Sequence, residues 1–128
     1  MFLVKTRIGP SAIHGTGCFA VEAIWKGQIV WQPDPRLDLT FSEEQLKAFP
    51  EVIQGFLHTY TYAELRDGGK VYILSSDHSR HMNHSSDPNV ISLDGIQDIA
   101  ARDIAADEEL TCDYDTFDLE ADAKLGRG

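Results

Sequence analysis

The sequence predicts a mostly β domain with short helices. Short strand-like runs recur along the 128 residues, turn-forming Gly, Pro and Asp residues separate them, and only one segment has a convincing helix start. The length suits one domain with its own core, and no linker or repeat divides residues 1–128.

The first strands are expected at residues 2–8, 17–21 and 28–31, each bounded by a turn signal such as Gly9-Pro10. A helix is expected to begin at Ser42, because Ser42 and Gln45 can form a capping box. It should stop or bend near Pro50, with a further helical stretch over residues 55–60.

Two hairpins and a last strand are expected in the second half. Residues 62–65 and 71–74 flank Asp67-Gly68-Gly69, and residues 90–93 and 96–100 flank Asp94-Gly95. Asp-Gly suits a tight hairpin turn, so the second hairpin is the better signalled of the two. The last strand is expected within residues 109–114.

Charge and composition narrow the class of partner. The net charge is −10, and residues 94–128 alone hold 11 acids and 3 bases, which favours a cationic partner. Direct nucleic-acid binding is not expected, because basic patches are lacking. No apolar run approaches the ~20 residues that span a bilayer, and the first residues do not form a signal peptide. We therefore expect a cytoplasmic protein with no membrane partner; export as an effector stays open.

The most polar segment is residues 80–89, Arg-His-Met-Asn-His-Ser-Ser-Asp-Pro-Asn. A loop this polar is either solvated or organised around a site. The pair Gly15 and Gly17 is either a plain turn or a close approach of backbone to a ligand, and it lacks the third glycine of a dinucleotide fingerprint.

The histidines and cysteines do not predict a metal site. His78, His81 and His84 are spaced by three, but neither a helix nor a Cys-rich partner accompanies them. Cys18 and Cys112 are expected to be free thiols.

In order, three segments resemble the SET-domain family of protein lysine methyltransferases. The glycine loop through the Ile24-x-Lys26-Gly27 turn is similar to the family's opening segment. Arg80-x-x-Asn83-His84-Ser85-x-x-Pro88-Asn89 is similar to its central motif, and Arg102-Asp103-Ile104 followed by Glu108-Glu109-Leu110-Thr111-x-Asp113-Tyr114 to its closing motif. The resemblance covers about residues 4–116 and leaves residues 117–128 as a short C-terminal tail.

The resemblance implies a β-clip, SET-type fold of small sheets in which the closing strand makes a knot-like crossing beside the central motif. It implies an S-adenosylmethionine-dependent protein-lysine N-methyltransferase that acts on a lysine-containing, cationic protein segment. The competing hypothesis on the same fold is a non-catalytic protein-binding module with a vestigial cofactor pocket. A His-rich metal protein is a third alternative.

The resemblance also assigns site residues. Tyr114 is expected to be catalytic. Those expected to bind the cofactor are His14, Gly15, Thr16, Gly17, Asn83, His84 and Phe117. Those expected near the substrate channel are Tyr60, Tyr62 and Tyr72, for each of which core packing is the stronger alternative.

The chain departs from the family at several places, one of them Asp77-His78, where members often have Gly-Asn. Ser86 stands where many members carry a Cys, and no Cys follows Cys112, so we expect a minimal SET domain without the zinc-binding region that follows it elsewhere. Asp107 replaces a Gly, a turn change expected to be harmless. Because the tail is short, the lid over the lysine channel is expected from Phe117, from the inserted segment, or from the second subunit of a homodimer.

Overall fold

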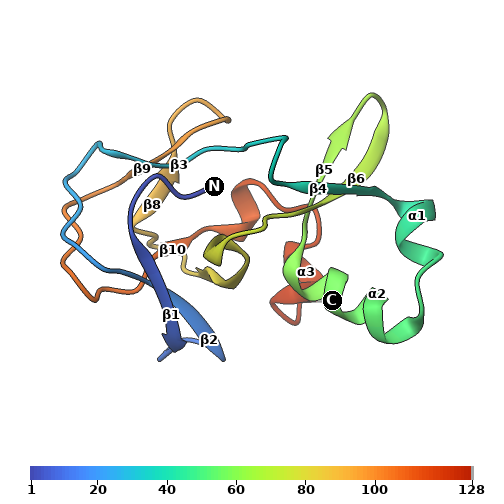
Figure 1. Ribbon diagram of the computed structural model, residues 1–128, viewed down its shortest axis with the longest axis horizontal. Coiled ribbons are helices and arrows are strands. Elements are labelled where there is room, and N and C mark those ends of the chain that lie inside the picture. The colour runs from blue at the N-terminus through green and yellow to red at the C-terminus, as the bar shows by residue number, and fades with distance from the viewer. Residues whose placement is uncertain (128) are drawn as a thin grey trace.

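The structure is a computed structural model that describes residues 1–127 (Figure 1). The strands are β1 (Thr6–Pro10), β2 (Thr16–Ala20), β3 (Ile29–Trp31), β4 (Leu39–Ser42), β5 (Tyr62–Arg66), β6 (Gly69–Leu74), β7 (Asn83–His84), β8 (Val90–Ser92), β9 (Asp98–Ala100) and β10 (Thr111–Cys112). The α-helices are α1 (Glu43–Lys47), α2 (Glu51–Tyr60) and α3 (Ala121–Lys124), and the 3₁₀-helices are η1 (His78–His81) and η2 (Tyr114–Thr116). Within residues 1–127, none of the helices has the length and apolar character that crossing a membrane requires.

The strands form four small sheets, as the predicted fold class requires. Three are antiparallel, with strand orders β1-β2, β3-β9-β8 and β4-β6-β5, and the fourth is the parallel pair β10-β7. Figure 1 shows β1–β3, β8 and β9 toward one end of the long axis and β4–β6 with α1 and α2 toward the other. The central and closing segments lie between these two ends.

Each end of the molecule has its own apolar core. The first core buries Cys18, Ala20, Ile24, Val30, Val90, Ala100, Ile104 and Leu110. The second buries Leu46, Leu57, Ala63 and Tyr72. The thiols of Cys18 and Cys112 are free, as expected, and burial raises the pKa of Cys18 to about 12.

Local turn and capping signals predicted the structure correctly. Asp67 and Gly68 both adopt positive φ in the β5–β6 hairpin, and Gly95 does so in the β8–β9 hairpin. The Ser42 hydroxyl accepts from the Gln45 backbone N–H while the Gln45 side chain accepts from the Ser42 N–H, so the capping box is confirmed.

Several boundaries differ from the expectation. β4 was not predicted, and α2 begins at Glu51, directly after Pro50, rather than at residue 55. The last strand contains only Thr111–Cys112, because the Asp113 carboxylate accepts from the Asp115 N–H and starts η2. Asp107 lies at φ 68°, in the left-handed region that favours glycine.

The pairing of β10 with β7 joins the closing motif to the central motif. Thr111 lies opposite Asn83, and Cys112 lies opposite His84. The buried Asn89 side chain reinforces this junction, since its Oδ1 accepts from the Thr111 N–H at 2.8 Å and its Nδ2 donates to the Glu109 carbonyl at 2.8 Å. The closing strand therefore runs beside the central motif; the knot-like crossing itself stays a prediction.

Candidate functional site

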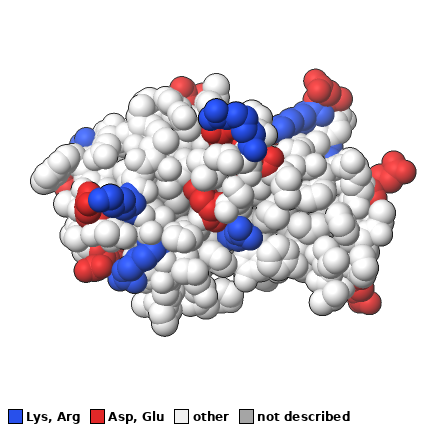
Figure 2. All heavy atoms as spheres, viewed as in Figure 1, with Lys and Arg blue, Asp and Glu red and all other residues white. Residues whose placement is uncertain are grey.

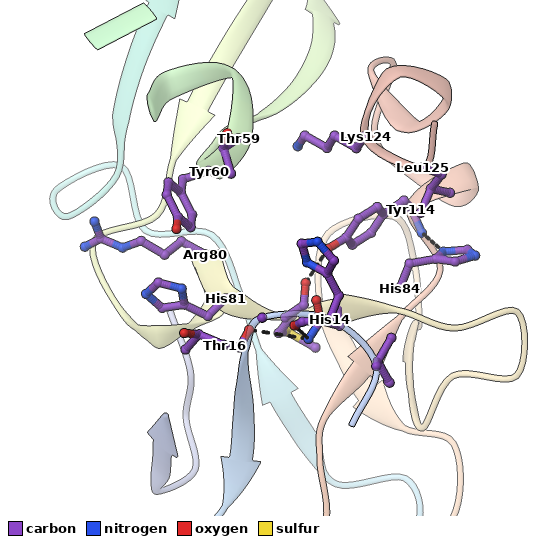
Figure 3. Close-up of a pocket in the computed structure, with 14 residues that line it drawn as sticks. His14, Thr16, Thr59, Tyr60, Arg80, His81, His84, Tyr114, Lys124 and Leu125 are labelled. Atoms are coloured by element: carbon purple, nitrogen blue, oxygen red, sulfur yellow. Dashed lines mark hydrogen bonds between the residues drawn. The ribbon is translucent and has the colours of Figure 1, made fainter. Parts of the chain in front are cut away.

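A cavity of about 440 Å³ lies where the opening loop, the central motif and the closing motif meet (Figure 3). Its volume falls in the ~300–1,000 Å³ range of small-molecule sites. The residues that line it are Ile13, His14, Gly15, Thr16, Thr59, Tyr60, Arg80, His81, Met82, Asn83, His84, Tyr114, Lys124 and Leu125. The three segments singled out in the sequence therefore converge on one space.

A smaller cavity of about 60 Å³ adjoins the first, and its walls are rich in aromatic rings. Tyr60, Tyr114 and Lys124 line both cavities, while Tyr62 and Phe117 line only the smaller one. The Phe117 ring meets those of Tyr62 and Tyr114 edge to face, at centroid distances of 5.7 and 6.1 Å. Tyr114 thus stands where the larger cavity meets a small one that is partly aromatic.

The side chains of Ser11, Asn83 and Glu109 form a hydrogen-bonded group, which we call the Glu109 cluster. The Glu109 carboxylate accepts from the Ser11 Oγ at 2.7 Å and from the Asn83 Nδ2 at 3.0 Å. Gly17 permits this packing, because a Cβ built on it would lie 2.6 Å from Glu109 Oε2. The cluster ties the loop after β1 to β7 and to the closing motif, beside the larger cavity that Asn83 lines.

The same contacts fix the orientation of the Asn83 amide. Its Nδ2 also donates to the His14 carbonyl at 2.9 Å, so acceptors surround the nitrogen and hold it in place. Among residues 1–127, no group donates a hydrogen bond to its Oδ1. This carbonyl oxygen is therefore available as an acceptor on the wall of the larger cavity.

Tyr114 is fixed at both its backbone and its hydroxyl. The hydroxyl donates to the Met82 carbonyl, and the backbone N–H donates to His84 Nδ1 at 3.1 Å. Burial raises the pKa of the hydroxyl well above its usual value near 10, and the nearby acidic groups, Asp118 and Glu109 among them, raise it further. Tyr114 is therefore neutral near pH 7, and its oxygen keeps lone pairs free to accept.

His84 Nδ1 accepts the Tyr114 N–H, so this nitrogen carries no proton in that arrangement. The Asp113 carboxylate lies 3.6 Å from the same nitrogen but is then no ion-pair partner. His84, Asp113 and Asp115 lie close enough together to suggest a metal site, yet Asp115 is paired with Arg127. The expectation that the chain binds no metal stays a prediction.

The structure brings together most of the residues expected at the site. His14, Gly15, Thr16, Asn83, His84, Tyr60 and Tyr114 line the larger cavity. Phe117, expected to bind the cofactor, lies on the smaller cavity with Tyr62. Gly17 lines neither cavity and instead faces Glu109.

Tyr72 also lines neither cavity. It packs in the second core, and its hydroxyl donates to Glu120 Oε1 at 3.1 Å. Reasoning from the sequence missed Ser11, Glu109 and Lys124. The only local signal for Glu109 is its place in the closing motif, and nothing near Lys124 in the sequence marks that residue.

Comparisons with known proteins identify the family of the chain. The sequence model of the SET domain matches residues 15–115. The fold is similar to that of a Polycomb Repressive Complex 2 chain from Chaetomium thermophilum solved with bound S-adenosylmethionine, with 22% identity and a TM-score of 0.66. That match covers 96% of this chain and 16% of the other, so this chain spans less than a fifth of the length of its Polycomb relative.

A second similar structure is described as a histone methyltransferase of Plasmodium falciparum. It is 21% identical with a TM-score of 0.58, and the match covers 87% of this chain and 93% of that one. No curated protein matches the sequence. SET domains use S-adenosylmethionine as methyl donor, and residues 15–115 match their model across the site described above. The chain belongs to the SET-domain family of lysine methyltransferases.

Proposed function

We propose that the chain is an S-adenosylmethionine-dependent protein-lysine N-methyltransferase that acts on a cationic, lysine-containing protein segment. One observation carries this proposal: Tyr114 joins a cavity large enough for a small-molecule donor to an aromatic cavity narrow enough for an alkyl amine. Methyl transfer to nitrogen is an in-line displacement, so the amine nitrogen and the donor sulfur must lie on opposite sides of the methyl carbon. Positioning the two reactants therefore supplies much of the rate enhancement.

The lining of the larger cavity fits the methyl donor. The free Oδ1 of Asn83 is suited to accept a hydrogen bond from the amino group of the donor. The backbone of His14, Gly15 and Thr16 can approach the donor closely, because Gly15 has no side chain and adopts a φ of 47°. His84, at the other side of this cavity, offers backbone and ring edges to a flat base. When bound, the donor supplies an electrophilic methyl group on a sulfonium.

The smaller cavity suits the substrate amine. A free lysine has a pKa near 10.4, so holding it neutral at pH 7 costs about 4.6 kcal/mol. Tyr62 and Phe117 disfavour the charged ammonium and lower this cost, whereas the Asp118 carboxylate in the same wall favours the ammonium, so the amine must lose its proton after docking. The Tyr114 hydroxyl donates its hydrogen to the Met82 carbonyl, so its oxygen can accept a hydrogen bond from the amine. Because the hydroxyl is neutral, it orients the amine without adding charge.

Substrate recognition rests on charge and on a sheet edge. The net charge of −10 favours a lysine-rich segment. On the face drawn in Figure 2, Lys and Arg lie beside Asp and Glu, and no large patch carries one sign. We therefore attribute the attraction of a cationic substrate to the net charge of the whole molecule rather than to a patch on that face. An extended peptide would add to the edge of β5 beyond Ala63, whose N–H and carbonyl already bond to the tail; the first residue of β5, Tyr62, lines the smaller cavity.

Residues 1–128 are proposed to act as a single domain with a short tail from residue 117. Since Phe117 of the same chain lines the smaller cavity, the aromatic lid does not require a second subunit. A homodimer stays a separate prediction, to be measured by sedimentation.

The test has two stages. Calorimetry with S-adenosylmethionine measures donor binding, and transfer of a radiolabelled methyl group to a mixture of basic proteins measures the reaction. Binding with transfer supports the proposal. Binding without transfer to any lysine-rich protein would favour the non-catalytic module, and no binding at all would refute both.

A further inference from the structure

The C-terminal segment places a lysine against the wall that both cavities share. The Lys124 Nζ donates to Asp118 Oδ2 at 2.6 Å and to the Thr61 carbonyl, and it lies 5.8 Å from the centre of the Tyr114 ring. Its side chain is only 16% exposed, and that of Asp118 is 1% exposed. Figure 3 shows this side chain extending over the cavity on the side where Thr59 and Tyr60 lie.

The same segment also occupies the sheet edge beside the smaller cavity. The Leu119 N–H donates to the Ala63 carbonyl at 3.0 Å, and the Ala63 N–H donates to Asp118 Oδ1 at 3.0 Å. Ala63 belongs to β5, an outer strand of its sheet. The segment therefore makes a backbone contact at an edge and inserts an ammonium group nearby, the two contacts expected of a docking lysine peptide.

We propose that Lys124 is an internal stand-in for the substrate's lysine: the tail (residues 118–125) holds it in that place until an incoming lysine exchanges with it. This inference rests on the proposed function and deepens it. The Asp118 carboxylate, the Thr61 carbonyl and the Tyr114 ring form a site for a primary ammonium, and Lys124 is its resident.

The ion pair explains why the exchange selects an amine. If Lys124 left alone, the buried Asp118 carboxylate would lose its only cationic partner among residues 1–127, which is unfavourable. Another alkyl ammonium restores the pair, whereas a neutral group of the same size does not. While it is bonded to the Asp118 carboxylate and the Thr61 carbonyl, Lys124 acts as an occupant rather than a methyl acceptor.

A second lysine serves as the matched control. Lys70 pairs with Glu120, so it also ties the tail to the sheet, but it lines neither cavity. A merely structural ion pair would behave alike at both positions.

The experiment follows the side-chain ammonium signals of protein labelled with ¹⁵N at lysine, with Lys124→Arg used to assign the Lys124 signal. The probe is n-butylamine, and n-butanol is its neutral control. We expect n-butylamine to shift or broaden the Lys124 signal while that of Lys70 and the n-butanol titration stay unchanged. An unchanged Lys124 signal at saturating amine, or equal changes at Lys70, would overturn the proposal.

Variants test the acceptor. Lys124→Met should bind n-butylamine about tenfold more tightly than the unaltered protein, because Asp118 is vacant. Asp118→Asn/Lys124→Met should lose that gain, and Lys70→Met should equal the unaltered protein. If Lys124→Met fails to fold, the titration of the unaltered protein still decides, and methylation found on Lys124 by mass spectrometry would count against an occupant role.

Calorimetry with S-adenosylmethionine on the same samples separates the two ideas. Donor binding and methyl transfer without amine exchange would keep the proposed function and reject the stand-in. Amine exchange without methyl transfer to any basic protein would support the ammonium site and reject the enzyme.

Discussion

Replacing Gly17 by alanine would test whether the Glu109 cluster holds the cofactor side of the site in shape. The new Cβ would lie 2.6 Å from Glu109 Oε2 and 2.9 Å from Glu109 Cδ. Because comfortable carbon contacts are ~3.5–4.0 Å, the carboxylate must retreat by roughly 1 Å. The Glu109 carboxylate cannot do so while it accepts from both Ser11 and Asn83.

The expected cost is about one charged hydrogen bond, or about 1.5–3 kcal/mol of unfolding free energy. Gly17 has no positive φ, so the backbone itself tolerates alanine and the effect is steric. Asn83 would also lose a partner that fixes its amide, so we expect S-adenosylmethionine to bind at least about tenfold more weakly. Urea unfolding measures the first quantity and calorimetry the second.

Gly9 provides the matched control, because it lies directly opposite Gly17 in the β1–β2 pair. A Cβ there would meet only a flexible Arg7 nitrogen at 3.3 Å and the Phe19 ring at 3.8 Å. Gly9→Ala should therefore change stability by less than about 0.5 kcal/mol.

A double-mutant cycle completes the test. In the Glu109→Ala background the two closest atoms are gone and the Ser11 Cβ contact at 3.0 Å remains, so adding Gly17→Ala should cost clearly less. Equal stability and equal donor affinity of the Gly17→Ala and Gly9→Ala proteins would refute the reasoning, as would an undiminished cost in the Glu109→Ala background.

Three further changes have definite expected outcomes. Tyr114→Phe should lower kcat about 10- to 100-fold while donor affinity holds, since one orienting oxygen is lost; full activity in the radiolabel assay would remove Tyr114 from its role. Asn89→Ala should cost about 2–4 kcal/mol in urea unfolding, because the side-chain bonds to the Thr111 N–H, the Glu109 carbonyl and the Glu108 carboxylate are lost. Burial raises the pKa of Asp98 to about 6 from its ordinary 3.8, so the folded state holds this proton more tightly and stability falls as pH rises from about 4 to about 6. Asp98→Asn should remove that fall and add up to about 3 kcal/mol at pH 7.5; an unchanged pH profile would contradict the assignment.

Local chemistry explains which parts of the fold could be predicted from the sequence. The two hairpins follow from residues that accept positive φ, and the start of α1 follows from the reciprocal bonds of Ser42 and Gln45. β4 has no such signal, because Leu39–Ser42 becomes a strand by pairing with β6. α3 was missed for the same reason: its four residues are held by contacts with distant parts of the chain rather than by a local pattern.

The candidate site divides in the same way. Asn83 and Tyr114 stand at matching positions of sequence motifs, so their convergence could be expected. Ser11 and Glu109 are 98 residues apart, and no local pattern announces that a serine hydroxyl will meet that carboxylate. The absence of a side chain at Gly17 gives Glu109 the space it occupies, and this can be recognised only when the folded structure brings β2 and the closing motif together.

The acidic C-terminal third shows how the structure changes the meaning of a sequence feature. Its charge was expected to attract a cationic partner, but several of its carboxylates already have cations of this chain: Asp118 has Lys124, Glu120 has Lys70 and Asp115 has Arg127. The Arg127 pair is half exposed and should weaken with salt, whereas the Lys124 pair is buried and screened little. Added salt should therefore weaken the Arg127–Asp115 pair before it weakens the Lys124–Asp118 pair. We expect an amine, rather than a rise in ionic strength, to displace Lys124 from Asp118.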